Sequence, residues 1–201
     1  DKLESKLTNL ENFLYTYEDW DPLIKLAILH YQFEAIHPFY DGNGRTGRIL
    51  NVLYLVEKGL IDLPIIYLSG YIIENKSHYY ELLLGVSSKQ NWEAWVLYLL
   101  KGVTQTAKKT REKIVAIKKL IDETAKEVKE KCPKIYSKDL VEVLFLSPYC
   151  KIRLLEDYNI AKRQAASEYL KELERQGFLE SEKVGRDLYF LNRPFLELLI
   201  S

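Results

Sequence analysis

Residues 37–48 read His-Pro-Phe-Tyr-Asp-Gly-Asn-Gly-Arg-Thr-Gly-Arg, and this stretch decides the fold around it. It combines a histidine, a side chain that exchanges protons near neutral pH, with a carboxylate, a Gly-Asn-Gly turn and two arginines three positions apart. Glycine and asparagine tolerate the backbone angles of a sharp turn, and the forked guanidinium of arginine matches phosphate oxygens. The stretch therefore predicts a site that handles phosphate groups.

The flanking residues place this stretch between two helices. Asp21-Pro22 is a helix-start signal, and the apolar spacing after it predicts a helix over 22–34. Pro38 disfavours a helical conformation of the residue before it, so this helix should end just ahead of the stretch. A second apolar helix is expected over 45–58, with Gly59 at its C-terminal cap. The glycine turn would then open a helix whose free N–H groups attract an anion.

The complete string resembles the signature of the Fic family, His-x-Phe-x-(Asp/Glu)-Gly-Asn-Gly-Arg-x-x-Arg. Fic proteins transfer AMP from ATP to a Ser, Thr or Tyr hydroxyl of a target protein. The resemblance implies a protein adenylyltransferase with ATP as substrate, Mg²⁺ as cofactor, and a target protein or the chain itself as acceptor. Transfer of phosphate, UMP or phosphocholine is the less favoured alternative, because kinase-like relatives alter the Gly-Asn-Gly-Arg stretch and this chain keeps it.

The resemblance also assigns roles to individual residues. His37 would deprotonate the target hydroxyl, and Asp41 would hold Mg²⁺. Phe39 would be buried and anchor the loop. Arg45 and Arg48 would bind the phosphates beyond the scissile bond, with Arg48 on the γ-phosphate. The other residues expected around the nucleotide are Pro38, Tyr40, Gly42, Asn43 and Gly44, the last three forming an anion hole with their backbone.

A second signal follows at Tyr71 and Asn75, which share a face at i and i+4 if their segment is helical. A tyrosine ring and an amide suit the base and the ribose of adenosine. Each residue has a structural alternative: Tyr71 as part of the core, and Asn75 as a surface residue near a helix break. His30 is expected in packing or on the helix surface, and His78 is expected to be exposed.

The chain departs from many Fic proteins in one respect. These carry an inhibitory helix, (Ser/Thr)-x-x-x-Glu-(Gly/Asn), whose glutamate pairs with the last arginine of the signature. The nearest match here, Ser77-x-x-x-Glu81, is followed by Leu82 and is incomplete. We expect that this sequence lacks the glutamate brake on Arg48, and also the upstream β-hairpin flap that aligns the target hydroxyl.

Composition favours a cytoplasmic globular protein. The 201 residues are 47% hydrophobic and carry a formal net charge of zero, so no charge excess points to nucleic acid or a membrane surface. Cys132 and Cys150 show no metal or redox spacing, and we expect reduced thiols inside a cell.

Periodicity predicts a mainly α fold in three parts: a catalytic core over 1–102, a long connecting helix over 103–134, and a winged-helix-like domain over 135–201. The long helix should begin near Trp92 and run to about Lys131, with a lysine- and glutamate-rich outer face. Such a helix could bridge two domains or pair with a second copy, so a homodimer is one expected partner state.

Residues 135–201 predict three helices and then two strands around Gly185, which is the winged-helix order. The third helix is expected over 160–176, between a cap at Asn159 and a stop at Gly177. This region holds 10 basic and 11 acidic residues, whereas DNA-binding domains are usually basic. We therefore favour a module that binds a target protein. The alternative is a nucleotide-sensing transcriptional regulator whose winged helix binds DNA.

Overall fold

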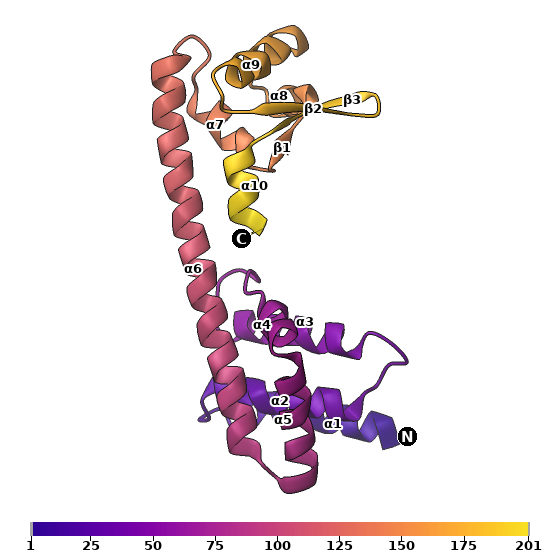
Figure 1. The fold of residues 1–201 in the computed structure, drawn as a ribbon. Coiled ribbons are helices and arrows are strands. Elements are labelled where there is room, and N and C mark those ends of the chain that lie inside the picture. Colours follow the sequence, from indigo (N-terminus) through magenta and orange to yellow (C-terminus); the bar gives the residue numbers. More distant parts are fainter. Residues whose placement is uncertain (1, 201) are drawn as a thin grey trace. The chain divides into compact units, whose positions relative to one another are not determined.

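The computed structural model describes residues 2–200, and within them the chain forms ten helices and one small antiparallel sheet (Figure 1). The mainly helical fold predicted from the sequence is confirmed. The chain divides into two compact units, residues 1–110 and 111–201. Among the described residues, no helix has both the length and the apolar character needed to cross a membrane.

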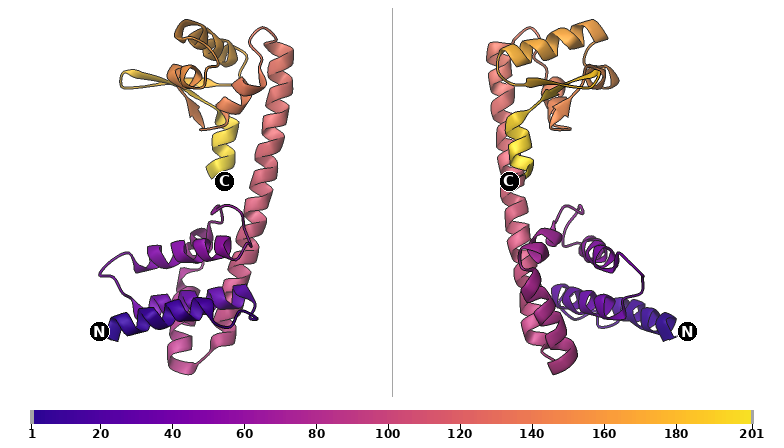
Figure 2. Two further views of the ribbon diagram at one scale, coloured as in Figure 1. Left: turned by 180° about the vertical axis from the view of Figure 1, so that it is seen from behind. Right: turned by 45° about the vertical axis from the view of Figure 1, so that its right-hand side comes forward.

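The first unit is entirely helical. Its elements are α1 (Lys2–Tyr15), α2 (Pro22–Ile36), α3 (Asn43–Glu57), α4 (Leu68–Glu74), α5 (Lys76–Lys89) and the first part of α6 (Trp92–Lys131). Helix α2 packs against α1 on one side and α3 on the other (Figure 2). The stretch 37–48 thus joins two helices that lie side by side, as its flanks predicted.

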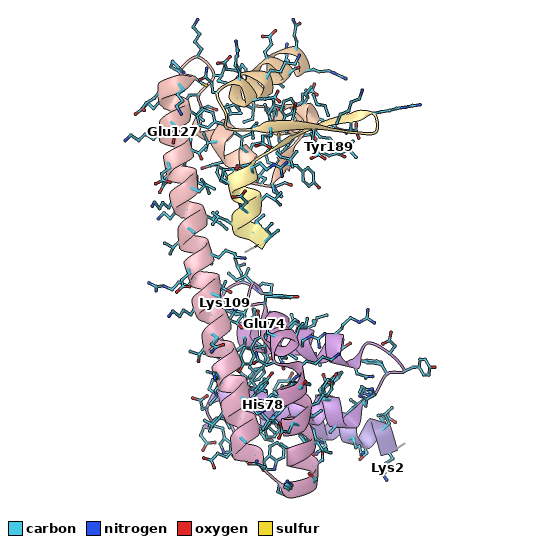
Figure 3. All side chains as sticks on the ribbon, viewed as in Figure 1. Lys2, Glu74, His78, Lys109, Glu127 and Tyr189 are labelled. Carbon is cyan, nitrogen blue, oxygen red and sulfur yellow. The ribbon has the colours of Figure 1, made fainter. Side chains whose placement is uncertain are left out.

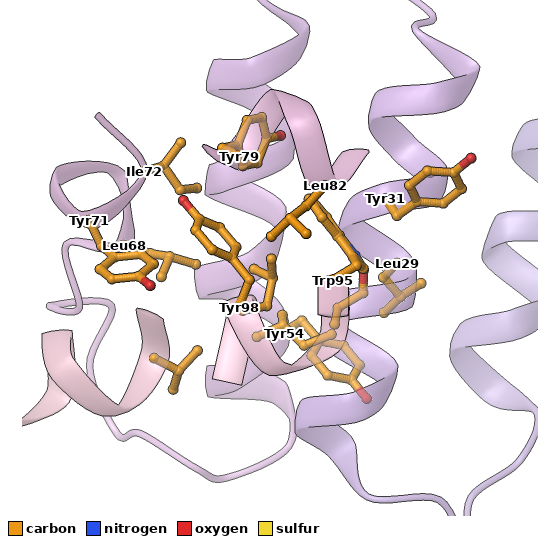
Figure 4. Close-up of a cluster of buried hydrophobic side chains, with 14 of the residues drawn as sticks. Leu29, Tyr31, Tyr54, Leu68, Tyr71, Ile72, Tyr79, Leu82, Trp95 and Tyr98 are labelled. Carbon is orange, nitrogen blue, oxygen red and sulfur yellow. The ribbon is translucent and has the colours of Figure 1, made fainter. Parts of the chain in front are cut away.

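Aromatic residues fill the core of this unit (Figure 4). Trp95 is fully buried, and its indole N–H donates to the carbonyl oxygen of Ala27 over 2.8 Å. The rings of Tyr31, Tyr79 and Tyr98 lie around it, with centroids 5.5–6.3 Å away. Because Trp95 lies in α6 and Ala27 in α2, this hydrogen bond ties α6 to the helix that precedes the motif.

The connection from α1 to α2 depends on a buried lysine. Lys25 is 2% exposed, and its ammonium group donates to the carbonyl oxygens of Leu14 at 3.1 Å and Thr16 at 2.6 Å. These carbonyls lie at the end of α1, where helical partners run out and a cation is favoured. Asp21 caps the start of α2 as predicted, its carboxylate accepting from the N–H of Leu23 at 2.8 Å.

An exposed ion pair connects α4 with α6 within the first unit (Figure 3). Glu74 and Lys109 are 3.5 Å apart, and both side chains are largely exposed. A pair of this kind contributes at most about 1 kcal/mol, so the aromatic core is the main source of packing between these helices.

The second unit has winged-helix order. After the end of α6 come α7 (Lys138–Leu144), β1 (Tyr149–Cys150), α8 (Ile152–Asp157), α9 (Arg163–Arg175), β2 (Glu180–Val184), β3 (Asp187–Leu191) and α10 (Arg193–Ile200). The strands form an antiparallel sheet in the order β1-β3-β2, with Tyr149 opposite Leu191 and Val184 opposite Asp187. Both cysteines are free and lie in the core of this unit.

One predicted boundary in this unit is wrong. Asn159 does not cap α9, which begins at Arg163 after Lys162. Instead, Asn159 has a left-handed backbone, with φ of 54°, just after the end of α8. Asparagine suits both positions, because it caps helices and also tolerates positive φ. The stop at Gly177 and the turn at Gly185 are confirmed, with φ of 83° and 62°.

Candidate active site

Helix α2 ends where the motif begins, as Pro38 predicted. His37 has a left-handed backbone, with φ of 52° and ψ of 59°, and its N–H donates to the carbonyl oxygen of Phe33 over 3.1 Å. The chain leaves the helix axis at this residue. The imidazole is exposed, and its Nδ1 lies 3.4 Å from the carbonyl oxygen of Glu34, which is a long contact. His37 is therefore accessible to a large substrate.

A buried asparagine closes the loop that follows. Asn43 is 3% exposed, and its amide Nδ2 donates to the carbonyl oxygen of Phe39 over 2.6 Å. In return its Oδ1 accepts from the N–H of Phe39 over 2.8 Å. These reciprocal bonds fix the loop, a role of the Asn43 side chain that the sequence did not reveal.

The loop opens directly into α3. Gly42 precedes the helix with φ of 85°, a conformation that disfavours any side chain. Its carbonyl oxygen accepts from both the N–H and the hydroxyl of Thr46, at 2.9 and 3.1 Å. No side chain caps this helix start within the described structure. The first turn of α3 therefore keeps N–H groups that no side chain caps, as an anion-binding helix terminus requires.

The acid and the first arginine of the motif bind each other. Asp41 and Arg45 are 3.0 Å apart, with side chains 82% and 71% exposed. The other carboxylate oxygen of Asp41 accepts from the N–H of Gly42 over 2.6 Å. Because the pair is solvated, its interaction is weak, and either side chain is free to take another partner.

The second arginine is held from a different helix. Arg48 is half-buried, and its Nε donates to the hydroxyl oxygen of Ser69, near the start of α4, over 2.9 Å. This bond leaves the two terminal nitrogens of the guanidinium for other partners. Ser69 is a contributor that sequence reasoning missed, since no local pattern links positions 21 residues apart.

The two aromatic residues of the loop differ in how exposed their side chains are. Phe39 was predicted to be buried, which is wrong: half of its surface is exposed, and its ring packs on one side against Phe33 with centroids 6.3 Å apart. The loop is held by Asn43 instead, so burial of this ring is not needed. Tyr40 is fully exposed, and Pro38 is half-buried.

A hollow of about 410 Å³ lies beside the two arginines. It is lined by Arg45, Arg48, Ile49, Val52, Leu53, Pro64, Ile66, Tyr67, Leu68 and Ser69. Its lining combines the two arginines with mainly apolar side chains. Neither of the expected adenosine contacts, Tyr71 and Asn75, belongs to this lining.

Tyr71 and Asn75 lie one helical turn apart, at the end of α4. Tyr71 is 8% exposed and packs against Tyr98 and Gly102, so it belongs to the core. Burial also raises the pKa of its hydroxyl. Asn75 is half-buried, and its amide donates to the carbonyl oxygen of Tyr71 over 2.8 Å. Its Oδ1 stays available, so a nucleotide contact by Asn75 remains a prediction.

Of the two histidines outside the motif, His30 has the less ordinary environment. It is 1% exposed, and its Nε2 lies 3.0 Å from the hydroxyl of Tyr79. Burial, together with the charge of Arg48, lowers the pKa of His30 to about 4, with the backbone of Gly47 partly opposing this shift. His30 is therefore a neutral packing residue at pH 7. His78 is exposed as expected, and its Nδ1 lies 3.5 Å from Oε2 of Glu81.

The fold and the site together define a class: helical proteins in which a histidine–glycine loop opens an arginine-bearing helix, followed by a winged-helix unit. The sequence profile of the Fic/DOC family matches residues 1–55, and that of the SoFic-like protein adenylyltransferase C-terminal domain matches residues 120–195. The chain is thus similar to the Fic/DOC family over its first 55 residues and to the SoFic-like C-terminal domain over residues 120–195.

Individual relatives agree with this assignment. A probable protein adenylyltransferase of Aquifex aeolicus is 46% identical over 57 residues, which are 28% of this chain and 18% of that protein. Protein adenylyltransferase fic-1 of Caenorhabditis elegans is 38% identical over 65 residues, 31% of this chain and 11% of that protein. The chain thus spans less than a fifth of these two relatives.

A solved structure shares the fold. The crystal structure of a Fic family protein from Desulfovibrio desulfuricans G20 superimposes with a TM-score of 0.51 at 22% identity. The match covers 95% of this chain and 55% of that one. At this level of identity the likeness supports the fold, and the chemistry is argued from the site itself.

Proposed function

We propose that this chain transfers AMP from ATP to a hydroxyl group of a target protein or of itself. One observation carries the proposal. The start of α3 has no side-chain cap and follows a loop that Asn43 fixes, with an exposed histidine before it and two arginines after it in the chain. Phosphoryl-type transfer depends mainly on positioning and on neutralising charge. The relatives named as protein adenylyltransferases support the same reaction.

Phosphate binding would use the first turn of α3. The N–H groups of Gly44 and its neighbours would donate hydrogen bonds to the diphosphate part of ATP. Arg45 would exchange its exposed partner Asp41 for a phosphate oxygen, an exchange that costs little because the pair is solvated. Arg48, fixed through Nε by Ser69, would present its terminal nitrogens to the γ-phosphate.

His37 would act as the base. Its imidazole takes the proton of the target hydroxyl while the hydroxyl oxygen forms a bond to the α-phosphorus. The bond from the α-phosphorus to the bridging oxygen breaks, and diphosphate leaves with the electron pair. Exposure of His37 suits an acceptor that is itself a protein, because its hydroxyl must reach the loop from solvent.

Asp41 fits the role of a magnesium ligand. Within residues 2–200, no group of three or more His, Cys, Asp or Glu side chains is placed to hold a metal. Mg²⁺ is commonly bound by one or two carboxylates together with substrate phosphates, and Asp41 supplies one exposed carboxylate at the helix start. When bound, the ion would neutralise charge on the phosphates.

Labelled ATP tests the reaction. We expect transfer of label from the α position to protein, with Mg²⁺ present, and none from the γ position. His37→Ala should abolish this transfer, whereas His78→Ala, which removes another exposed histidine of the same unit, should leave it intact. Transfer from γ-labelled ATP alone, or transfer that survives His37→Ala, would contradict the mechanism.

The second unit would select the protein partner. Several of its basic residues are already paired, among them Lys151 with Asp187 at 2.8 Å and Arg193 with Glu180 at 2.7 Å. These pairs leave less positive charge for a nucleic-acid backbone, which favours a protein partner over DNA. A gel-shift titration at two salt concentrations tests the choice, since salt-sensitive binding to duplex DNA would support the regulator alternative.

A further inference from the structure

Glu34, on the last turn of α2, has no place in the mechanism above, yet its carboxyl group lies at the motif. Its Oε1 is buried and has no hydrogen-bond partner within the described structure. An unpartnered buried carboxylate is costly, and a polar atom left in this state in a folded protein calls for an explanation. The residues around it provide one.

Glycines of the motif helix make room for this carboxyl group. A Cβ atom on Gly47 would stand 2.6 Å from Glu34 Oε1, which no side chain could tolerate without movement. The corresponding point on Gly44 is 3.9 Å from the same oxygen. Gly44 and Gly47 are three residues apart and share a face of α3. The glutamate therefore lies directly against the first turns of the helix that opens the phosphate site.

Arg48 approaches the same point on Gly44 as Glu34 does. Its Nη1 is 3.0 Å from the point where a Cβ would stand on that glycine. The guanidinium of Arg48 and the carboxyl of Glu34 are thus near one another, and the only hydrogen bond described for Arg48 goes to Ser69. The two groups interact through their charges rather than by contact.

Two opposing effects act on the protonation of Glu34: the burial of its carboxyl group and the positive charge of Arg48. Burial raises the pKa of the carboxyl, and the positive charges of Arg48 and then His37 oppose this shift. The remaining titratable neighbours carry no charge at neutral pH, because burial lowers the pKa of His30 and raises that of Tyr79. Arg48 is thus the main positive group that favours the ionised form of Glu34.

We propose that Glu34 is a positioning residue that acts through Arg48, and that it takes up a proton when phosphate binds this arginine. Phosphate neutralises the guanidinium, so the carboxylate loses the charge that stabilised it and becomes protonated. By linkage, an ionised Glu34 weakens phosphate binding and a protonated Glu34 strengthens it. ATP affinity should therefore fall as pH rises. This inference rests on the assignment of Arg48 to ATP phosphate.

Calorimetric titration with Mg²⁺ and ATP, in two buffers of different ionisation enthalpy, measures the proton directly. The background should be His37→Ala, which removes the imidazole whose charge also acts on Glu34. We expect Glu34→Gln to lower proton uptake and to flatten the pH dependence of the dissociation constant, which in the parent should rise several-fold with increasing pH. Glu57→Gln, an exposed glutamate on α3, is the matched control and should behave as the parent.

Equal proton uptake in Glu34→Gln and its parent would overturn the inference while leaving the proposed function intact. Absence of ATP binding in every variant would overturn both. Should Glu34→Gln fail to fold, carboxyl ¹³C NMR of the His37→Ala protein labelled at glutamate Cδ serves instead. One buried glutamate should then titrate at a higher pH in the presence of Mg²⁺ and ATP than in their absence, and an unchanged titration would refute the coupling.

Discussion

Asp41 accepts a hydrogen bond from Arg45 over 3.0 Å, so the acid and the first cation of the motif neutralise each other on the surface of the protein. In this arrangement neither residue is committed to a ligand. Because the pair is exposed, it contributes little to the stability of the fold. The contribution of Asp41 to magnesium binding can therefore be measured separately from its contribution to stability.

Asp41→Ala should affect metal dependence without affecting stability. We expect the free energy of unfolding to change by less than about 1 kcal/mol, because only an exposed ion pair and an exposed hydrogen bond from Gly42 are lost. The Mg²⁺ concentration for half-maximal AMP transfer should rise at least tenfold or transfer should disappear. Glu57→Ala, which removes an exposed carboxylate at the end of α3, should change neither quantity. Unaltered magnesium dependence in Asp41→Ala would remove this residue from the metal site.

Asn43→Ala should loosen the motif loop. The change removes both bonds to the backbone of Phe39 and leaves its partly buried N–H and C=O groups without this partner, at a cost of about 1–3 kcal/mol. AMP transfer should fall more than stability alone explains, since the loop also shapes the anion site. Thermal unfolding and initial rates at saturating ATP measure the two effects. Asn75→Ala provides the comparison: it should alter ATP affinity while leaving the loop intact.

Ser69→Ala should weaken ATP binding through Arg48. Without the hydroxyl that accepts from Nε, the guanidinium loses its fixed orientation. We expect the KM for ATP to rise severalfold with little change in kcat, the pattern of lost ground-state binding. Ser88→Ala removes an exposed hydroxyl that bonds only within α5, so it is the appropriate control. Equal KM values in the two variants would show that Ser69 has no part in orienting Arg48.

Gly47→Ala should destabilise the first unit. The added methyl would meet Glu34 Oε1 at 2.6 Å and Phe33 at 3.1 Å, so α2 and α3 must separate or a side chain must move. Overpacking of this kind costs typically about 1–3 kcal/mol. At Gly85, in α5, the same substitution meets its nearest neighbour at 4.0 Å and should be neutral or slightly stabilising. Urea unfolding of both variants decides between these outcomes.

Acid should destabilise the protein through His30. Its pKa is about 4 in the folded state and 6.5 in the reference state, so between these values the unfolded chain binds a proton that the folded chain does not. The free energy of unfolding should therefore fall as pH drops from 6.5 toward 4, by on the order of 3 kcal/mol in total, and should be unaffected above 6.5.

Comparison with His30→Gln isolates this contribution. The raised pKa of Glu34 acts in the opposite direction, stabilising the folded state at low pH, but it is present in both proteins. We expect His30→Gln to be less stable at pH 7 and to lose less on acidification. Parallel curves for the two proteins between pH 6.5 and 4 would show that His30 does not carry the acid sensitivity.

Local signals predicted most of the helices, because they act over only a few residues. Pro38 ends α2 and Gly59 follows the end of α3, both as expected. Two short elements were not predicted from the sequence. Strand β1 has two residues, too few for an alternating pattern, and α10 spans only eight. In α10 a start signal was present, since Asn192 Oδ1 accepts from the N–H of Phe195 and Pro194 follows the first helical position.

The site was predictable as a set of residues but not as a set of contacts. The signature identified the loop and both arginines, whereas the bond from Arg48 to Ser69 and the approach of Glu34 to Gly47 join separate helices. Such contacts depend on how α2, α3 and α4 pack, and no local pattern encodes that packing. The prediction that Phe39 is buried was wrong for a different reason: Asn43, at the start of α3, anchors the loop through the backbone of Phe39.

The two hydrogen bonds between the Asn43 side chain and the backbone of Phe39 affect which substitutions this loop can accept. Since the backbone between positions 39 and 43 is fixed by one internal side chain, ligand binding requires little ordering of the loop, and affinity gains from this preorganisation. The fully exposed side chain of Tyr40 lies within that rigid frame. Substitution at this position can alter which acceptor approaches His37 while the frame that orients the phosphates keeps its shape.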